Sequence, residues 1–300
     1  VSFMRTRLIY PLDLVKALYF RDIDMRPNFL VIGAMKCGTT SMCHYLSQSR
    51  DVYVPDAKDI YFFSDNGLYS RGMEWYESCF EDNPGKPVVG EGTDDYSKVW
   101  AHPEAPSRIK DNLPDCKIIY MVRHPMRQME SAYKHRVANS AERLPFNQAI
   151  TDSSFDYVAT ADYLSCLAPY LELFNDEQIR VIFNEDLSAQ AEDEVASVLS
   201  FIGCDPDVSM VNFERMNTAD GKFYDGKVAA VFRRSTVFAR IAQSLPGSLK
   251  SMAKSVLTKR KPPEIVWERG TKKFVSDRLL ENSREFLKRY GKPEDFWSFE

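Results

Sequence analysis

Residues 28–45 read NFLVIGAMKCGTTSMCHY, and this stretch decides how the rest of the chain is interpreted. Its apolar residues 29–32 end at Gly33, which is typical of a strand buried on both faces of a sheet. A short loop with Gly38 follows, and a helical pattern begins at Thr40. Glycines let backbone N–H groups approach an oxyanion, and the dipole of the following helix favours negative charge at its N-terminus. The stretch therefore predicts a phosphate-binding loop.

The position of the lysine narrows the kind of phosphate. In nucleoside-triphosphatase loops the lysine directly follows the second glycine and reaches the β- and γ-phosphates. Here Lys36 lies inside the loop, between Gly33 and Gly38. We expect it to reach a nearer group, such as a 5′-phosphate and the atom that bridges it to a leaving group. Taken alone, the loop would also fit an ordinary strand-to-helix turn.

A second buried strand carries a complementary signal. Residues 117–122, KIIYMV, run into Arg123, and Ser131 follows within a helical segment. Arg123 would lie at the carboxyl end of a parallel strand, the edge where open α/β sheets bind ligands. A guanidinium there can hold a second phosphate in bidentate fashion, and a hydroxyl can donate to it. Alone, Arg123 would fit a salt bridge at a strand end, but together with the loop it predicts a ligand with two phosphate positions.

Strands and helices alternate along the chain. Besides the two strands above, residues 52–55, 88–90 and 179–183 read as short extended segments. Helical spacing occurs in residues 40–47, 103–112, 126–139, 157–174, 189–202 and 271–290. Such alternation predicts an α/β fold with a central parallel β-sheet and helices on both faces.

Four ordered motifs resemble those of sulfotransferases that use 3′-phosphoadenosine 5′-phosphosulfate (PAPS). GAMKCGTT, residues 33–40, resembles the family's 5′-phosphosulfate loop, and VRHPMRQMES, residues 122–131, resembles its 3′-phosphate motif. Residues 58–76 and 161–187 are similar to segments of the heparan-sulfate and bacterial carbohydrate-type branch. The resemblance implies a P-loop-like sheet, PAPS as donor, 3′-phosphoadenosine 5′-phosphate (PAP) as product, and no metal, because fixed donors would replace one.

The resemblance also implies roles for residues of the two phosphate motifs. Lys36 would be catalytic, because it would stabilise charge on the bridging oxygen and the 5′-phosphate as the product leaves. Arg123 and Ser131 would hold the 3′-phosphate that distinguishes PAPS from ATP. Cys37 would be either a small residue filling the loop or a reactive thiol at a helix N-terminus. The expected contacts to the 5′-phosphate are Lys36, Cys37, Gly38, Thr39 and Thr40.

Sulfuryl transfer needs a base that takes the acceptor's proton as the bond to sulfur forms. Asp59 stands at the position of the family's catalytic glutamate, and Tyr61 stands where relatives often have histidine. The resemblance therefore makes Asp59 the second catalytic residue. Asp59 would otherwise be an ordinary loop charge, and the alternative bases are His44, His102 and His135.

Residues 91–96, EGTDDY, resemble the family's segment Glu-Lys-Ser-Pro-x-Tyr near the acceptor. Gly92 replaces a lysine of heparan-type members, and Asp94 and Asp95 replace a neutral pair. The loss of a cation and the gain of two anions would disfavour a polyanionic acceptor, so we expect a neutral or cationic one. The two acids could instead be solvated or cap a turn. The expected acceptor contacts are Tyr61, Glu91, Asp94, Asp95 and His135.

Two further segments resemble donor-binding parts of the family. Phe223 and Tyr224 lie in a turn-rich segment where an aromatic ring could stack on adenine, although ordinary packing would explain them equally well. Arg269 and Gly270 resemble an Arg-Lys-Gly contact to phosphate that lacks its middle lysine. The intervening residues 228–261 are amphipathic and basic, and would form either a lid or a solvated pair of helices.

Length and composition favour one sulfotransferase domain over residues 1–300. The chain is 44% hydrophobic, which is enough for a large core, and its net charge of −4 gives no reason to expect nucleic-acid binding. The N-terminal extension is amphipathic and would either pack against the fold or lie on a membrane surface. We divide the domain into this extension (1–27), a nucleotide-binding core (28–215), a variable basic helical or lid region (216–270) and a C-terminal helix (271–300).

Two observations bear on the compartment. No apolar run reaches the length that spans a bilayer, and residues 1–27 lack a secretory apolar region, so we expect a cytoplasmic enzyme unless an N-terminal anchor was removed. Six cysteines without C-x-x-C spacing fit a reducing compartment and argue against a zinc site.

The sequence thus predicts transfer of a sulfuryl group from PAPS to a hydroxyl or amine of a small-molecule or glycan acceptor, by an enzyme that could be a homodimer. One alternative is a P-loop small-molecule kinase, which the position of Lys36 and the lack of a clear magnesium-binding aspartate after a strand disfavour. Another is a non-catalytic nucleotide-binding protein of the same fold, for which the departures at Asp59 and Gly92 leave room.

Overall fold

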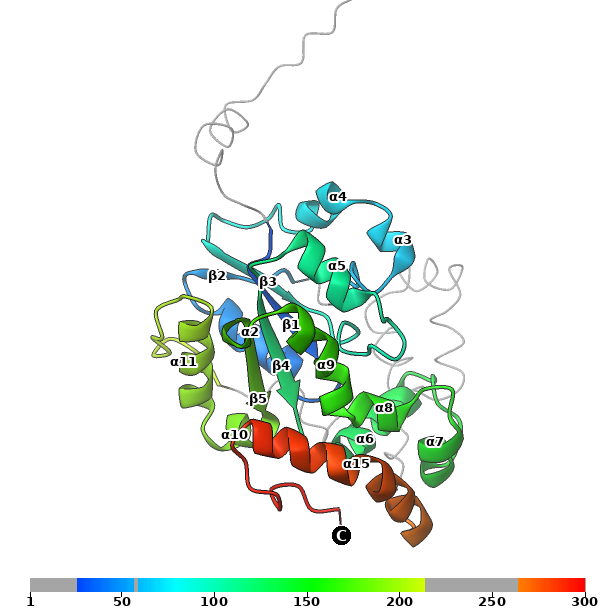
Figure 1. Ribbon diagram of the computed structural model, residues 1–300. Helices are drawn as coiled ribbons and strands as arrows, with labels where there is room; N and C mark the ends of the chain where they lie inside the picture. Colours follow the sequence, from blue (N-terminus) through cyan, green and yellow to red (C-terminus); the bar gives the residue numbers. More distant parts are fainter. Residues whose placement is uncertain (1–25, 57–58, 214–263, 300) are drawn as a thin grey trace, which may run out of the picture.

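A five-stranded parallel sheet forms the middle of the molecule (Figure 1). The computed structural model describes residues 26–56, 59–213 and 264–299. The strand order is β2-β3-β1-β4-β5, so that the strand before the predicted phosphate loop is central. The strands are β1 (Phe29–Gly33), β2 (Val52–Tyr53), β3 (Val88–Gly92), β4 (Lys117–Val122) and β5 (Ile179–Phe183). All five were predicted, and the α/β fold class is confirmed.

Helices cover both faces of this sheet. Helix α2 packs with α11, and α5 packs with α9, and Figure 1 shows α11 and α9 on opposite sides of the strands. The first half of the chain contributes α2 (Thr39–Ser47), α3 (Asn66–Tyr69), α4 (Met73–Ser78), α5 (Ala105–Asn112) and α6 (Pro125–Ala138). The second half contributes α7 (Phe146–Asp152), α8 (Tyr157–Ala161), α9 (Tyr163–Leu173), η1 (Asp176–Gln178), α10 (Asn184–Ala189), α11 (Ala191–Phe201) and α15 (Arg269–Arg289).

The single long helix predicted over residues 157–174 is wrong, because the chain breaks between α8 and α9 at Asp162. The Asp162 backbone has ψ of 79°, and its side chain accepts a hydrogen bond from the backbone N–H of Ser165. An aspartate that caps a helix in this way offers the backbone an alternative to continuing the previous one. Apolar spacing continues across the break, which is why periodicity did not reveal it.

The C-terminal helix α15 packs against α9, and the chain after it turns back beneath this helix (Figure 1). Trp297 is buried there, with its ring centroid 5.6 Å from that of Tyr163 and 6.1 Å from that of Phe286. This cluster joins the end of the chain to the centre of the fold.

Some predictions concern residues outside the described ranges. They are the N-terminal amphipathic segment up to residue 25, the ring stacking of Phe223 and Tyr224, and the basic stretch 228–261. Among the helices that the structure does describe, none is long and apolar enough to cross a membrane.

Candidate active site

The predicted phosphate loop leaves β1 at the carboxyl edge of the sheet and enters α2 at Gly38. The N–H of Ala34 donates to the carbonyl of Met121 on β4 at 2.7 Å, so the loop starts between two paired strands. Lys36 and Gly38 both have positive φ, at 67° and 99°. A Cβ on Gly38 would lie 2.7 Å from Nδ2 of Asn184, so both the conformation and the close neighbour require glycine here.

Two amides from other elements hold this loop from outside. Nδ2 of Asn184, at the end of β5, donates to the carbonyl of Cys37 at 3.1 Å. Nε2 of Gln128, fully buried on α6, donates to the carbonyl of Met35 at 2.9 Å. Neither contact is predicted from the sequence. The position of Asn184 directly after a strand, on the ligand-binding edge, was the available signal.

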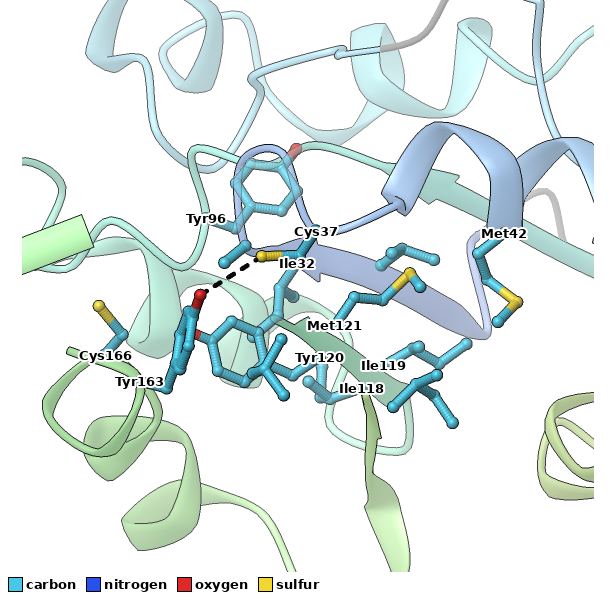
Figure 2. Packing of buried hydrophobic residues seen from close by; sticks show 14 of the residues in the cluster. Ile32, Cys37, Met42, Tyr96, Ile118, Ile119, Tyr120, Met121, Tyr163 and Cys166 are labelled. Carbon is cyan, nitrogen blue, oxygen red and sulfur yellow. Dashed lines mark hydrogen bonds between the residues drawn. The ribbon is translucent and has the colours of Figure 1, made fainter. Parts of the chain in front are cut away.

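The side chain of Cys37 points into the core. Its Sγ lies 3.6 Å from the hydroxyl of Tyr163, and Figure 2 shows this contact among buried rings and aliphatic side chains. Burial raises the pKa of the thiol to about 12, although the Tyr163 hydroxyl and the Arg123 guanidinium oppose the shift. The alternative of a reactive thiol is therefore wrong, and only the Cys37 backbone is placed to contact a phosphate.

The second phosphate motif follows the strand next to β1. Arg123 is half-buried and follows β4 directly, two residues after Met121, whose carbonyl accepts from Ala34 of the loop at 2.7 Å. Ser131 lies on α6 one turn after Gln128, so the two share a helix face. Because Gln128 contacts the loop, this face of α6 is turned towards it. The structure thus brings Arg123 and Ser131 to the edge that carries Lys36.

Arg269 and Gly270 form the first turn of α15 and are exposed. The segment just before them is tied to α6, because Nε1 of Trp267 donates to Oε1 of Glu130 at 2.9 Å. Glu130 is the residue before Ser131, so the fold brings the third predicted phosphate contact to the helix of the second. The role of Arg269 and Gly270 in binding phosphate remains a prediction.

The segment with the predicted base is fixed to the end of β3. The N–H of Asp59 donates to the carbonyl of Gly92 at 3.2 Å, and the N–H of Tyr61 donates to Oγ1 of Thr93 at 3.4 Å. Asp59 and Tyr61 have φ of 64° and 60°, which non-glycine residues adopt rarely and often at functional sites. Phe62 follows and is fully buried, with its ring stacked 4.5 Å from that of Tyr76. This anchor holds Asp59 at the same sheet edge as Lys36.

Glu91 does not fit the predicted contact with an acceptor. It is 2% exposed, and its Oε1 accepts hydrogen bonds from the hydroxyls of Tyr76 at 2.9 Å and Tyr96 at 2.6 Å. Its Oε2 accepts from Oγ1 of Thr93 at 2.7 Å. Burial raises the pKa of Glu91, and the three hydroxyls moderate the shift. The Thr93 hydroxyl that donates to Glu91 also accepts from the N–H of Tyr61. The buried carboxylate therefore helps to fix the segment that carries Asp59.

The two added acids at positions 94 and 95 are not isolated anions. Nζ of Lys98, which is 8% exposed, lies 3.4 Å from Oδ1 of Asp94 and also bonds to Oδ1 of Asp95. Burial lowers the pKa of Lys98, but the two carboxylates outweigh burial and raise it on balance. We expected two added negative charges at this position, but the positive charge of Lys98 reduces the net gain to one. His102 lies 3.7 Å from the other oxygen of Asp95.

The glycine in place of the family's lysine also has a packing reason. A Cβ on Gly92 would lie 2.5 Å from Sγ of Cys43, so no larger side chain fits there while Cys43 is present. Of the other alternative bases, His44 lies in the last turn of α2, and His135 is exposed on α6 beside Asn139.

Residues 26–224 match the family model described as the sulfotransferase domain. The chain belongs to this sulfotransferase family. The sulfotransferase is 34% identical over 110 residues to membrane-associated sulfotransferase kil1 of Dictyostelium discoideum, a match covering 36% of this chain and 22% of kil1. It is 27% identical over 184 residues to human (Homo sapiens) heparan sulfate glucosamine 3-O-sulfotransferase 6, covering 59% of this chain and 52% of the relative. The chain therefore spans about half or less of these relatives.

Solved structures agree with the sulfotransferase fold. A sulfotransferase from Alicyclobacillus acidocaldarius is 27% identical with a TM-score of 0.57, and the match covers 75% of this chain and 99% of that one. The sulfotransferase domain from the curacin biosynthetic pathway is 13% identical with a TM-score of 0.50, covering 84% and 97%. At the lower identity the likeness concerns the fold alone.

Proposed function

We propose that this sulfotransferase moves a sulfuryl group from PAPS to a hydroxyl or amine of a carbohydrate or small-molecule acceptor and releases PAP. The observation that carries the proposal is the pairing of β1 with β4, which places the Lys36 loop and Arg123 at the ends of neighbouring strands. Family membership supports it. Relatives named as heparan sulfate sulfotransferases also support it, because heparan sulfate is a carbohydrate.

The residues present fit a donor with two phosphates. A loop with two positive-φ residues enters a helix N-terminus at Gly38, where backbone N–H groups and the helix dipole favour an anion. Its carbonyls at Met35 and Cys37 are held by Gln128 and Asn184, which stabilises the loop in one conformation. Arg123 and Ser131 supply a guanidinium and a hydroxyl for a second phosphate.

The two proposed catalytic residues, Asp59 and Lys36, act on the acceptor and on the leaving group. Asp59 takes the proton of the acceptor hydroxyl or amine as the acceptor bonds to sulfur. Lys36 stabilises the charge that develops on the bridging oxygen as its bond to sulfur breaks. PAPS supplies the activated sulfuryl group, and Arg123 with Ser131 orients it through the 3′-phosphate.

The surroundings of Tyr61 support a neutral or cationic acceptor. Burial raises the pKa of the Tyr61 phenol, and the carboxylates of Asp59, Asp95 and Asp94 raise it further. The Tyr61 backbone is held by Thr93, the residue before Asp94 and Asp95. Lys98 compensates one of them. A net negative acceptor side would repel a polyanion. Tight binding of a heparin fragment at moderate salt would contradict this part of the proposal.

The donor is tested by calorimetric titration of PAP, with 5′-AMP and ATP in parallel. Loss of a charge-assisted phosphate contact costs about 1.5 to 3 kcal/mol, so Arg123→Ala should weaken PAP roughly 10- to 100-fold and leave 5′-AMP unchanged. Arg284→Ala, at an exposed position of α15, is the matched control. Equal binding of ATP and PAP, or indifference to Arg123→Ala, would overturn the proposal and revive the kinase.

Two finer parts of the proposal have separate tests. All six cysteines are free thiols, which supports action in the reducing cytoplasm, and fractionation of cells expressing the full natural protein tests this. The sequence leaves the oligomeric state open between a monomer and a homodimer, and light scattering distinguishes the two. A non-catalytic nucleotide-binding protein would bind PAP but transfer no label from PAPS to any acceptor.

A further inference from the structure

A cavity lies beside the proposed acceptor side. Its volume is about 610 Å³, within the range of cavities that hold a small ligand. The side chains that decide its chemistry are Trp100, Phe155, Asp156, Asp162, Phe274 and Arg278. None of them belongs to the donor motifs.

One aromatic ring separates this cavity from the site already described. Phe155 lines the cavity, and the guanidinium of Arg136, on α6 after Ser131, lies 4.3 Å from its ring centroid. Nζ of Lys98, which pairs with the acids beside Tyr61, lies 5.8 Å from the same ring. The cavity is therefore adjacent to both the nucleotide helix and the acid pair.

Its lining combines one exposed indole with polar groups. Trp100 is 39% exposed, although it packs edge to face on Phe155 at 5.8 Å. The Arg278 guanidinium stacks 3.6 Å from the ring centroid of Phe274. Aromatic rings can pack on the C–H faces of a sugar, while carboxylates and hydroxyls bind its hydroxyls. An exposed indole over a polar cavity therefore suits a saccharide better than a purely apolar ligand.

The charge of the lining selects among saccharides. Asp156 and Asp162 carry two negative charges against the single positive charge of Arg278, which leaves one net negative charge. Asp162 is also held in place, because both its oxygens accept from Nδ2 of Asn282 on α15 at 3.1 and 2.9 Å. Fixed acids of this kind favour neutral or amine-bearing sugars over sulfated ones.

We infer that this cavity is an acceptor subsite that holds neutral or amine-bearing sugar residues next to the one that receives the sulfuryl group. The inference rests on the proposed function, because it names the substrate class of that same site. It assigns to Trp100 the binding of a sugar ring remote from the reacting atom, while Phe155 supports the indole from the side.

The experiment titrates three trisaccharide-sized probes into the PAP-loaded protein by calorimetry. They are tri-N-acetylchitotriose, which is neutral, its de-N-acetylated form, which carries amines, and a heparin-derived fragment. Trp100→Ala should weaken the first two about tenfold or more, because it removes the ring on which the sugar packs, and Trp100→Phe should restore most of the affinity. Ser154→Trp, at an exposed position lining the cavity, should block the same probes by filling it. Leu173→Ala, exposed on α9 outside the cavity lining, is the control.

PAP affinity and the unfolding temperature are measured on every variant, so a folding defect is recognised by its loss of PAP binding. Binding of neither sugar at roughly 10 mM, or binding that ignores both Trp100→Ala and Ser154→Trp, overturns the inference. A heparin fragment that binds more tightly through Trp100 overturns the charge argument. If PAP fails to bind while the sugars bind through Trp100, the donor proposal fails and the sugar site stands.

Discussion

His124 and Ser298 are joined by a hydrogen bond of 2.7 Å between Nε2 of the imidazole and the backbone carbonyl, although 174 residues separate them. Nδ1 of the same ring accepts from the N–H of Met126 at 3.2 Å. An imidazole that accepts at Nδ1 in its neutral form carries its proton on Nε2, so Nε2 donates to Ser298. The C-terminal segment is therefore attached directly after Arg123.

Replacing this ring should loosen the donor site. His124→Ala removes the N-cap of α6, which costs about 1 kcal/mol, and also releases the Ser298 segment. We expect a lower unfolding temperature and PAP binding several-fold weaker than that of the wild type. His124→Asn, which can still cap the helix, should recover stability but only part of the affinity. Equal PAP affinity in wild type and His124→Ala would show that the attachment has no bearing on the donor.

The same ring should make stability depend on pH. Burial lowers the pKa of His124 below its usual 6.5, although the Ser298 carbonyl and Glu185 oppose the shift. A depressed pKa means that the unfolded chain binds the proton more readily, so the stabilisation is present above pH 6.5 and is lost as the pH falls through the folded-state pKa. Between pH 7.5 and about 5, thermal unfolding should therefore shift down more in wild type than in His124→Asn.

Lys98→Met tests the pairing of the acidic loop. The substitution leaves Asp94 and Asp95 together without their buried cation, and we expect a loss of about 2 kcal/mol, less than for a fully buried pair because both acids are partly exposed. Denaturant unfolding measures this loss. Lys273→Met removes an exposed pair with Asp277 on α15 and should change stability by less than about 0.5 kcal/mol. Similar effects of the two substitutions would mean that Lys98 is not a structural ion-pair partner.

Gly92→Ala tests the close approach to Cys43. A methyl group there meets Sγ at 2.5 Å, and we expect destabilisation of about 1 to 3 kcal/mol from overpacking. Cys43→Ala frees the space, so Gly92→Ala combined with Cys43→Ala should recover part of the loss. If the double mutant loses as much stability as the two single mutants together, contact with Cys43 is not the cause of the loss in Gly92→Ala.

Asp59→Asn tests the base. The amide keeps the size of the side chain but cannot take a proton, so sulfuryl transfer should fall about 10²- to 10⁴-fold while PAP binding stays within a factor of about two. Transfer of labelled sulfur from PAPS to an acceptor measures the rate, and calorimetry measures the binding. Undiminished transfer would move the role to His102, the alternative base that contacts the acid pair.

The sheet and the placement of both phosphate motifs could be predicted because each rests on a local pattern. The buried strands are short apolar runs, and the carboxyl-edge rule places whatever follows them. The contacts that hold the loop could not be predicted. Asn184 and Gln128 reach it through single side-chain amides from distant segments, and such contacts produce no periodicity in the sequence.

Two errors at the acceptor side have different origins. The ion pairs of Lys98 were visible in principle, since Asp94 and Asp95 precede it by four and three residues, the spacing that brings side chains together in a helical turn. The burial of Glu91 was not, because it depends on the hydroxyls of Tyr76 and Tyr96 closing over one strand end. The resemblance to a family segment matched Glu91 to the right position in the sequence, but it did not predict that the side chain is buried.

The adjacency of β1 and β4 has a consequence for how such enzymes can diversify. The two strand ends that we propose to bind phosphate are separated by the spacing of paired strands, about 4.8 Å, which the backbone hydrogen bonds between the strands keep constant. A substitution in either loop leaves the separation of the strand ends unchanged as long as the two strands stay paired. The acceptor side instead depends on loop side chains such as Tyr61 and Trp100, which can be exchanged singly. A chain with this topology can therefore acquire a new acceptor by point mutation while its choice of donor stays the same.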